Sequence, residues 1–234
     1  MSNTTRLPWR TTLLWPVRYL INRFLFGNSR KIRGKGNSIH IGNSLLTETS
    51  ILIEGDGNVL HIGDGLRLFN VRIVVKGRGC RIVFEGPGYF TGKLICGDSG
   101  SRIKIGSGGT AEGALLVAHE GTSIQIGNDC ALGSGVTIQS SDTHAIYDTL
   151  SGKRLNPAQD IEIQRHVWIA QGATILKGSV IGEGAVIGAR ALVTRANPIP
   201  PSAIAVGIPA QTVSRNIHWT RERTGGKNEN RLSL

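Results

Sequence analysis

Apolar residues recur along most of this 234-residue chain with a short, regular period. In the C-terminal half, six of them fall six residues apart: Ile163, Ile169, Ile175, Ile181, Ile187 and Val193. Upstream, related segments begin at residues 36 (GNSIHIG), 57 (GNVLHIG), 79 (GCRIVFEG, degenerate), 100 (GSRIKIG) and 121 (GTSIQIG). A six-residue apolar period fits neither a helix nor an alternating strand. It predicts a parallel β-helix, in which each hexapeptide forms one short strand and a turn, and three hexapeptides close a triangular coil of about 18 residues.

The period disappears once, in SSDTHAIYDTLSGKRLNPAQD, residues 140–160. We expect one coil over residues 126–140, followed by a protruding loop. Because a regular solenoid offers few concave sites, such a loop is a natural place for chemistry. The alternative is a tolerated surface insertion.

Two further segments flank the predicted solenoid of residues 36–200. Residues 1–35 carry apolar side chains at helical spacing (Leu13, Val17, Leu20, Ile21 and Phe24), interrupted by arginines, and lack the continuous apolar run of a membrane span or a cleaved signal. This predicts an amphipathic helix that either lies on an anionic membrane or docks on the body of the protein. Residues 201–234 predict a proline-rich cap on the solenoid, a short helix in QTVSRNIHWTRER, and a polar tail.

The net charge of +11 is concentrated at the ends of the chain. Residues 1–35 hold eight basic residues and no acid, residues 215–234 hold five and two, and residues 36–214 hold fourteen of each. A neutral body disfavours a nucleic-acid-binding function. The three cysteines lack paired spacing, which indicates a reducing compartment and predicts a cytoplasmic protein.

His144 is the candidate for acid–base chemistry within the loop. A histidine titrates near neutral pH, so its imidazole is suited to take a proton from a hydroxyl group. Asp142 lies two residues away, on the same side of an extended chain, where a carboxylate fixes a histidine tautomer. A single histidine in a polar loop is more often structural or merely exposed, so this pattern alone is weak evidence.

The order of several motifs is more specific than any one of them. The interruption SSDTHAIYD is followed by LNPAQDIEI, by HVWIAQGATILKGSVIGEGAVIGARALVT and by IPPSAIAVGIPAQTV. Over residues 120–220 this order resembles the left-handed β-helix hexapeptide acyltransferases, and in motif it is most similar to their surface (capsular) polysaccharide O-acetyltransferases, including those acting on sialic acid polymers. The N-terminal coils agree with that family in periodicity alone.

The resemblance implies an acetyl-CoA-dependent O-acetyltransferase. His144 would be the general base for direct transfer of the acetyl group to a sugar hydroxyl, without an acyl-enzyme. Asp142 and Trp168 fall on the acceptor side of the implied site. For Trp168 the alternative is an aromatic residue of the core or of an interface.

The resemblance also places acetyl-CoA along the outside of the solenoid, with contacts at Ala170, Gln171, Ala189, Thr194, Arg195 and Arg215. Two departures from the family pattern affect this set. Ala170 replaces a glycine, and Gln211 replaces a basic residue, so that Arg215 is expected to take part of the phosphate contact. For Arg195 and Arg215 the alternative is solvated surface charge.

Members of the family are trimers with active sites between subunits, so the resemblance implies a homotrimer with a polysaccharide acceptor. The cysteines and the basic N-terminal segment predict a cytoplasmic protein that is either free or peripheral at the inner face of the cytoplasmic membrane. Three other functions stay open: acetylation of an amino sugar or a small molecule, a zinc enzyme like the γ-class carbonic anhydrases, and a non-catalytic scaffold. The zinc family needs two histidines five residues apart, and Thr149 stands at that distance from His144. No metal is therefore expected, although His119 and His166 could approach His144 in space.

Overall fold

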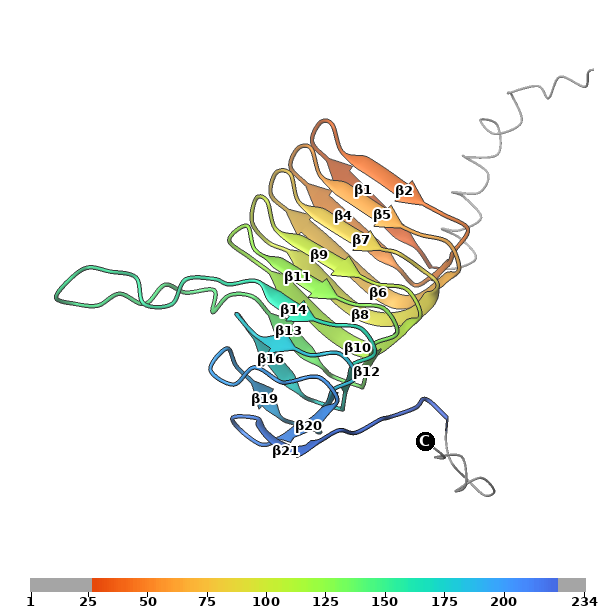
Figure 1. The fold of residues 1–234 in the computed structure, drawn as a ribbon. Helices are drawn as coiled ribbons and strands as arrows, with labels where there is room; N and C mark the ends of the chain where they lie inside the picture. The colour runs from red at the N-terminus through yellow and green to blue at the C-terminus, as the bar shows by residue number, and fades with distance from the viewer. Residues whose placement is uncertain (1–26, 223–234) are drawn as a thin grey trace, which may run out of the picture.

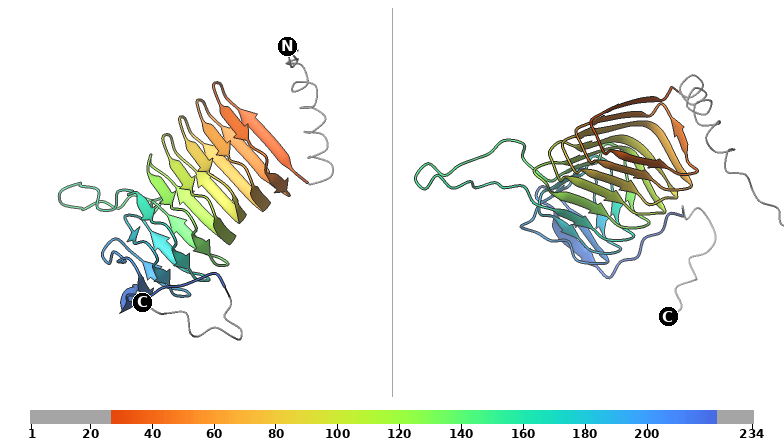
Figure 2. Two further views of the ribbon diagram at one scale, coloured as in Figure 1. Left: turned by 45° about the vertical axis from the view of Figure 1, so that its right-hand side comes forward. Right: turned by 90° about the horizontal axis from the view of Figure 1, so that it is seen from above.

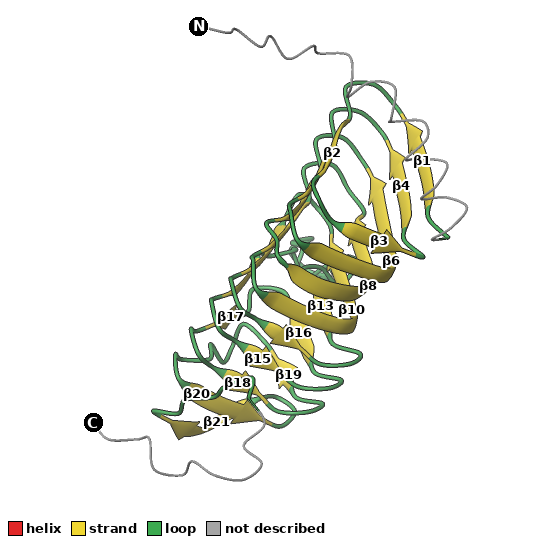
Figure 3. Cartoon of the chain, turned by 90° about the vertical axis from the view of Figure 1, so that its right-hand side faces the viewer, coloured by secondary structure: helices red, strands yellow, loops and turns green. Residues whose placement is uncertain are grey.

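The chain winds into a stack of coils that form a parallel β-solenoid (Figure 1). This computed structural model describes residues 27–222, which contain 21 β-strands. Figure 3 shows strands and loops but no helix within this range. The prediction of an all-β parallel β-helix is therefore confirmed. Residues 1–26, which include the predicted N-terminal helix, lie outside the described residues, and within 27–222 no helix could cross a membrane.

Three faces make up each coil, and within a coil the chain follows them in the order I, II, III. The first described coil begins on face II, with β1. Face I contains β3 (Leu45–Thr47), β12 (Ala131–Leu132), β15 (Trp168–Ile169), β18 (Val186–Ile187) and β20 (Ala203–Val206). Face II contains β1 (Ser29–Arg33), β4 (Ser50–Glu54), β13 (Thr137–Gln139), β16 (Thr174–Leu176) and β19 (Leu192–Val193). Face III contains β2 (Ser38–Ile41), β5 (Val59–Ile62), β7 (Arg81–Phe84), β9 (Arg102–Ile105), β11 (Ser123–Ile126), β14 (Ile161–Ile163) and β17 (Val180–Ile181).

Faces I and II are continuous in the middle coils. There β6 (Leu66–Lys76), β8 (Gly88–Cys96) and β10 (Gly109–Ala118) run along face I, bend at a register shift and continue along face II. We call the three edges of the prism corners I/II, II/III and III/I. Because every coil repeats this path, residues far apart in sequence stack in columns along each face and each corner.

Like residues stack on like in the core, which explains the apolar period. On face III, Ile62, Phe84, Ile105, Ile126 and Ile163 follow one another in register from strand to strand. The six residues of the tight period, from Ile163 to Val193, are each 1% exposed or less. Burial of these side chains provides the main stabilising free energy of the solenoid.

The C-terminal end of the solenoid differs from its prediction. Residues Gln211–Arg215 form strand β21, which pairs antiparallel with β20, so the predicted short helix is wrong over these residues. The physical reason is that β20 would otherwise leave a free sheet edge, and β21 satisfies its backbone groups. Residues 216–222 then form an extended strap along corner III/I, where Trp219 is buried.

The N-terminal boundary of the solenoid also lies earlier than expected. Strand β1 pairs in parallel with β4 through five residues, from Ser29 with Ser50 to Arg33 with Glu54. The first coil therefore begins before residue 36, where the repeat becomes visible in the sequence. Arg30 hides this strand from the apolar pattern, because it stands in register with the buried Ile51 and so takes an inward position of the repeat.

Candidate active site

The interruption of the repeat is a protruding loop, as predicted. It leaves corner II/III after β13 and extends away from the prism in both views of Figure 2. The loop closes at its base, where the Gln159 amide donates to the Ser140 carbonyl at 3.0 Å. Ile161 then pairs with Ile124 of the preceding coil, so the solenoid resumes in its original register.

The buried side chain of Asn156 holds the two strands of the loop together. Its Nδ2 donates to the His144 carbonyl and to Asp142 Oδ2, both at 2.8 Å, and its Oδ1 accepts from the Ile146 amide at 2.6 Å. Both polar atoms of the amide are therefore satisfied, which a buried amide requires. Asn156 fixes the backbone on both sides of residue 145.

Asp142 is bound to the loop and to the coil below it. Lys177 Nζ donates to Asp142 Oδ2 at 2.5 Å and to the Asn156 carbonyl at 3.0 Å. The hydrogen bond from Lys177 and that from Asn156 hold the pKa of Asp142 below its ordinary value. The Asp142 carboxylate therefore positions the loop, and no hydrogen bond joins it to the His144 imidazole within the described chain.

A second tether joins the loop to the coil above it. Arg154 makes a two-pronged ion pair with Glu120, at 2.5 Å and 2.9 Å, and the Ser141 hydroxyl donates to Glu120 Oε1 at 2.6 Å. These hydrogen bonds lower the pKa of Glu120 to about 2. Glu120 is therefore ionised at neutral pH, and the loop is attached to the coils on both sides.

His144 is exposed to solvent, and its position follows from a tight turn. The His144 amide donates to the Asp142 carbonyl at 2.7 Å around Thr143, which has φ of 69°. This is the pattern of a γ-turn, and positive φ is unfavourable for a β-branched residue. No hydrogen bond to the His144 ring occurs among residues 27–222. The imidazole is thus held by its backbone and free to meet a substrate.

Trp168 lies on a different side of the prism from the loop. It begins β15 on face I, is 42% exposed, and has its ring 6.0 Å from that of Trp219. The loop leaves corner II/III, which is the corner opposite face I. One chain by itself therefore does not bring Trp168 and His144 together.

Five of the six residues expected to contact acetyl-CoA lie at the two edges of face II. Ala170, Gln171 and Ala189 lie at corner I/II, where the Ala170 amide donates to the Ile187 carbonyl at 2.8 Å and the Gln171 carbonyl accepts from the next coil at 2.9 Å. Thr194 and Arg195 follow β19 at corner II/III, beneath the loop. Strands β16 and β19 run between these two groups.

The corner beneath the loop is closely packed. Gly178 has φ of +73°, and a Cβ placed on it would lie 2.4 Å from Gln159 Oε1 and 2.9 Å from Arg195 Cβ. The positive φ and these two close contacts leave room only for glycine. Arg195 and Gln159, at the base of the loop, therefore both lie against the backbone of Gly178. Arg215, in contrast, ends β21 on face I opposite Ala203, away from this group.

Sequence reasoning missed a second network, at corner III/I. His166 contacts Asp129 Oδ2 at 2.6 Å through Nδ1, and its ring stacks on Trp219 at 4.2 Å. Arg221 donates to Asp129 Oδ1 at 2.8 Å. Burial acts against ionisation of Asp129, but the His166 and Arg221 bonds outweigh it and lower the pKa of Asp129. This network attaches the C-terminal strap, and His166 is committed to it.

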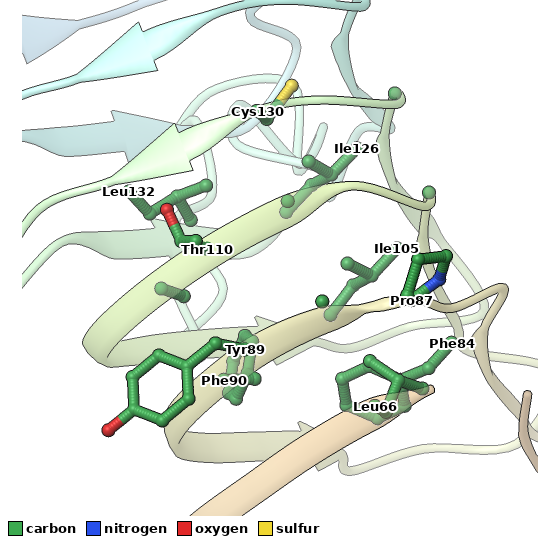
Figure 4. Close-up of a pocket in the computed structure, with 15 residues that line it drawn as sticks. Leu66, Phe84, Pro87, Tyr89, Phe90, Ile105, Thr110, Ile126, Cys130 and Leu132 are labelled. Atoms are coloured by element: carbon green, nitrogen blue, oxygen red, sulfur yellow. The ribbon is translucent and has the colours of Figure 1, made fainter. Parts of the chain in front are cut away.

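Two hollows among residues 27–222 lie away from the loop. Figure 4 shows an apolar pocket between coils, lined among others by Leu66, Phe90 and Leu132. A more polar hollow at corner III/I is lined among others by His166 and His218. In the described part of the chain, no three His, Cys, Asp or Glu side chains gather as a metal site would require.

Known proteins resemble this chain in part of its sequence and in its fold. Residues 160–195 match the family model described as bacterial transferase hexapeptide (six repeats). A polysialic acid O-acetyltransferase of Escherichia coli O1:K1 / APEC is 44% identical over 94 residues, which cover 40% of this chain and 30% of that protein. A polysialic acid O-acetyltransferase of Neisseria meningitidis is 42% identical over 48 residues, which cover 20% of this chain and 22% of that protein. The matched segments thus span less than a third of either relative.

Two solved structures resemble the chain over most of its length. The polySia-specific acetyltransferase NeuO superimposes with a TM-score of 0.77 at 28% identity, covering 85% of this chain and 84% of that one. The polysialic acid O-acetyltransferase OatWY superimposes with a TM-score of 0.74 at 27% identity, covering 86% of this chain and 94% of that one. The resemblance to hexapeptide-repeat acyltransferases that the motifs indicated is therefore confirmed.

Proposed function

We propose that this protein transfers an acetyl group from acetyl-CoA to a hydroxyl group of a surface polysaccharide. The observation that carries the proposal is the loop, which presents the free imidazole of His144 on an anchored backbone at one end of face II. The similarity in sequence and fold to two polysialic acid O-acetyltransferases supports the same reaction class and favours an acidic sugar polymer as the acceptor.

Acetyl-CoA binds along face II in this proposal. A face of about five residues measures roughly 16 Å along its strands, which suits an extended pantetheine arm. Ala170, Gln171 and Ala189 contact one end of the arm, and Thr194 and Arg195 the other. Arg195 offers a planar guanidinium group that binds phosphate in two-pronged geometry. Arg215 joins them only if a neighbouring chain brings it near.

The chemical step is a direct transfer. His144 takes the proton of the acceptor hydroxyl as its oxygen attacks the thioester carbonyl carbon, and backbone N–H groups stabilise the oxyanion. The tetrahedral intermediate then collapses, the C–S bond breaks, and the imidazolium returns the proton to the departing CoA sulfur. The products are a sugar acetyl ester and free CoA thiol, and no metal takes part.

An acceptor panel tests this proposal. Purified protein is incubated with acetyl-CoA and acidic polysaccharides, neutral polysaccharides, amino sugars and small alcohols, while free thiol is followed. The protein adds little background because Cys80, Cys96 and Cys130 are buried, and burial raises the pKa of Cys130 to about 11. We expect thiol release to depend on an acidic polysaccharide. Release that no acceptor accelerates contradicts the proposal.

A homotrimer with the active site between subunits is part of the proposal. The loop carries four exposed apolar side chains, Ile146, Tyr147, Leu150 and Leu155, and Leu150 is 96% exposed. An apolar hairpin that projects from the body is typical of an interface, and contact with a second chain would cover it. The same contact would supply the Trp168 that one chain holds too far from His144.

Replacing Leu150 with glutamate is expected to shift the protein from trimer to monomer and to lower turnover with it, because a buried charge opposes the contact. Lys153→Glu, three residues away and also exposed, is the charge control and should leave the trimer intact. Light scattering after size-exclusion chromatography measures the mass. A wild-type monomer, or a Leu150→Glu trimer as stable as wild type, would rule out this arrangement.

We propose that the reaction takes place in the cytoplasm. The free state of all three cysteines supports a reducing compartment.

A further inference from the structure

Four aromatic side chains contact one another in succession at corner III/I, and Trp168 is the last of them. The ring centroids of His218 and His166 lie 6.0 Å apart, and those of His166 and Trp219 lie 4.2 Å apart. The rings of Trp219 and Trp168 follow at 6.0 Å, a distance at which aromatic pairs attract each other. Trp219 is buried, whereas Trp168 is 42% exposed. The last contact therefore joins a buried ring to an exposed one.

The other neighbours of Trp168 leave its ring free to turn. Its side chain is on the outer side of β15, since the next residue, Ile169, is fully buried in the core. Its register partners on the adjacent strands are Ala131 and Val186, whose side chains are much shorter than an indole. Within residues 27–222 the indole nitrogen of Trp168 has no hydrogen bond. In this range Trp219 is therefore the large side chain that restricts the Trp168 ring.

Trp219 is itself fixed by a reciprocal contact with His166. Trp219 Nε1 donates to the His166 carbonyl at 2.9 Å, and His166 Nε2 lies 3.1 Å from the Trp219 carbonyl oxygen. Two residues later, Arg221 donates to Asp129 Oδ1 at 2.8 Å and to the Thr110 hydroxyl oxygen at 3.0 Å. Asp129 also binds His166 Nδ1 at 2.6 Å. One carboxylate therefore fastens both His166 and the strap that carries Trp219.

The strap extends beyond the coil that the C-terminal end needs to cap. It starts at the last coil, where the Ile217 amide donates to the Ser202 carbonyl at 3.0 Å. It then passes His166 and reaches Asp129, each on an earlier coil. A cap needs to cover only the last coil of a solenoid. Because ordering further residues costs conformational entropy, the extra length indicates a role at the coil that contains Trp168.

We infer that Trp219 is a positioning residue, which holds the Trp168 ring in the orientation that meets the acceptor sugar. Asp129 and Arg221 keep Trp219 in place. The inference rests on the proposed function, in which Trp168 of one chain lies near His144 of a neighbouring chain. A ring that is already ordered loses little side-chain entropy when a sugar packs on it, so its ordering contributes to affinity for the acceptor. Affinity for acetyl-CoA does not depend on it, because the proposed donor site lies on face II.

A double-mutant cycle in the full-length protein tests the inference. The KM values for the acceptor polysaccharide and for acetyl-CoA are measured for wild type, Trp168→Ala, Trp219→Leu and the double variant. We expect Trp219→Leu to raise the acceptor KM about tenfold and to leave the KM for acetyl-CoA unchanged. In the Trp168→Ala background, Trp219→Leu should have no further effect, because it acts through the Trp168 ring. Trp219→Phe, which keeps a ring in contact with Trp168, should recover most of the acceptor affinity.

Two controls separate positioning from a loss of stability. Arg221→Gln should raise the acceptor KM in the same direction as Trp219→Leu. Arg78→Gln removes a comparable ion pair, with Asp56 at 3.6 Å on corner II/III, and should leave both KM values unchanged. Phe84→Leu removes a buried aromatic ring from the core, so it should lower the Tm without changing the acceptor KM.

The outcomes distinguish this inference from the proposed function on which it rests. A wild-type protein that transfers acetyl to no acceptor would overturn both. Transfer that is sensitive to Trp168→Ala but not to Trp219→Leu would overturn the positioning role alone. Effects of Trp168→Ala and Trp219→Leu that are fully additive would also overturn it, because they would show that Trp219 acts independently of the Trp168 ring.

Discussion

Replacing His144 with alanine is expected to lower turnover by about 10²- to 10⁴-fold, the usual contribution of a general base. The solenoid should remain folded, because the His144 side chain is exposed and only its backbone bonds to Asn156 and Asp142. The loss should appear in kcat more than in the KM for acetyl-CoA, because the proposed donor site lies on face II, away from the His144 side chain. Steady-state kinetics with the best acceptor measures both quantities, and circular dichroism verifies the fold.

His61→Ala is the matched control for this substitution. His61 is also a surface histidine, on face III of the second coil, where its ring stacks on His40 at 4.7 Å. It should retain wild-type turnover. If His144→Ala works within twofold of wild type, then His144 is not the base, and the loop has another role.

Replacing Asn156 with leucine is expected to lower turnover by about 100-fold, although Asn156 touches no substrate. The change removes three hydrogen bonds, so the Ile146 amide and the His144 carbonyl lose their partner in a partly buried position. A fully buried polar group without a partner costs about 1–3 kcal/mol, and a partly buried one costs less. A displacement of about 1 Å in a reacting group can reduce a rate by this factor. Since Asn156 acts through His144, it is a positioning residue.

Two readouts distinguish positioning from general destabilisation. Hydrogen exchange should increase within residues 141–158 and stay unchanged in β11 and β14. Thr149→Ala, near the tip of the same loop, is the control and should keep wild-type turnover. An Asn156→Leu protein with normal turnover, or one that unfolds as a whole, would show that the Asn156 network does not set the position of His144.

The solenoid could be predicted from the sequence because the apolar period along the chain and the stacking of side chains in the core are the same repeat. Each core position stacks on its equivalent one coil away, so Ile163 and Ile181 repeat in sequence for the reason that they touch in space. The loop was equally visible, since a segment without inward residues cannot form part of a coil. The strand β1 was missed because Arg30 takes one of its inward positions, opposite Ile51, so the apolar period is broken there.

The contacts that hold the loop could not be predicted in the same way. Lys177 and Glu120 come from the coils below and above, and their pairing with Asp142 and Arg154 depends on which corner each occupies. The sequence analysis did not single out Asn156, because LNPAQDIEI served there only as one of several ordered motifs, and nothing in it indicates that the Asn156 amide joins both strands of the loop. The antiparallel β21 was mistaken for a helix because QTVSR has no strong preference and the free edge of β20 decides its conformation.

Some of the predicted site residues lie close together within one chain, and others lie on a different face of the prism. Five of the residues predicted to contact acetyl-CoA lie around face II, because corners repeat at fixed intervals along the sequence. Trp168 and Arg215 lie on face I, so their predicted roles depend on a neighbouring subunit. This division makes the trimer a functional requirement of the account.

The product of the reaction tests the central claim most directly. Acetyl-CoA labelled with ¹³C at the acetyl carbonyl is incubated with the protein and the preferred polysaccharide, and the recovered polymer is examined by NMR. The account predicts a ¹³C ester on a sugar oxygen, formed in equal amount to the CoA released and absent with His144→Ala. Release of CoA accompanied only by free acetate, or a label found in an amide, would contradict it.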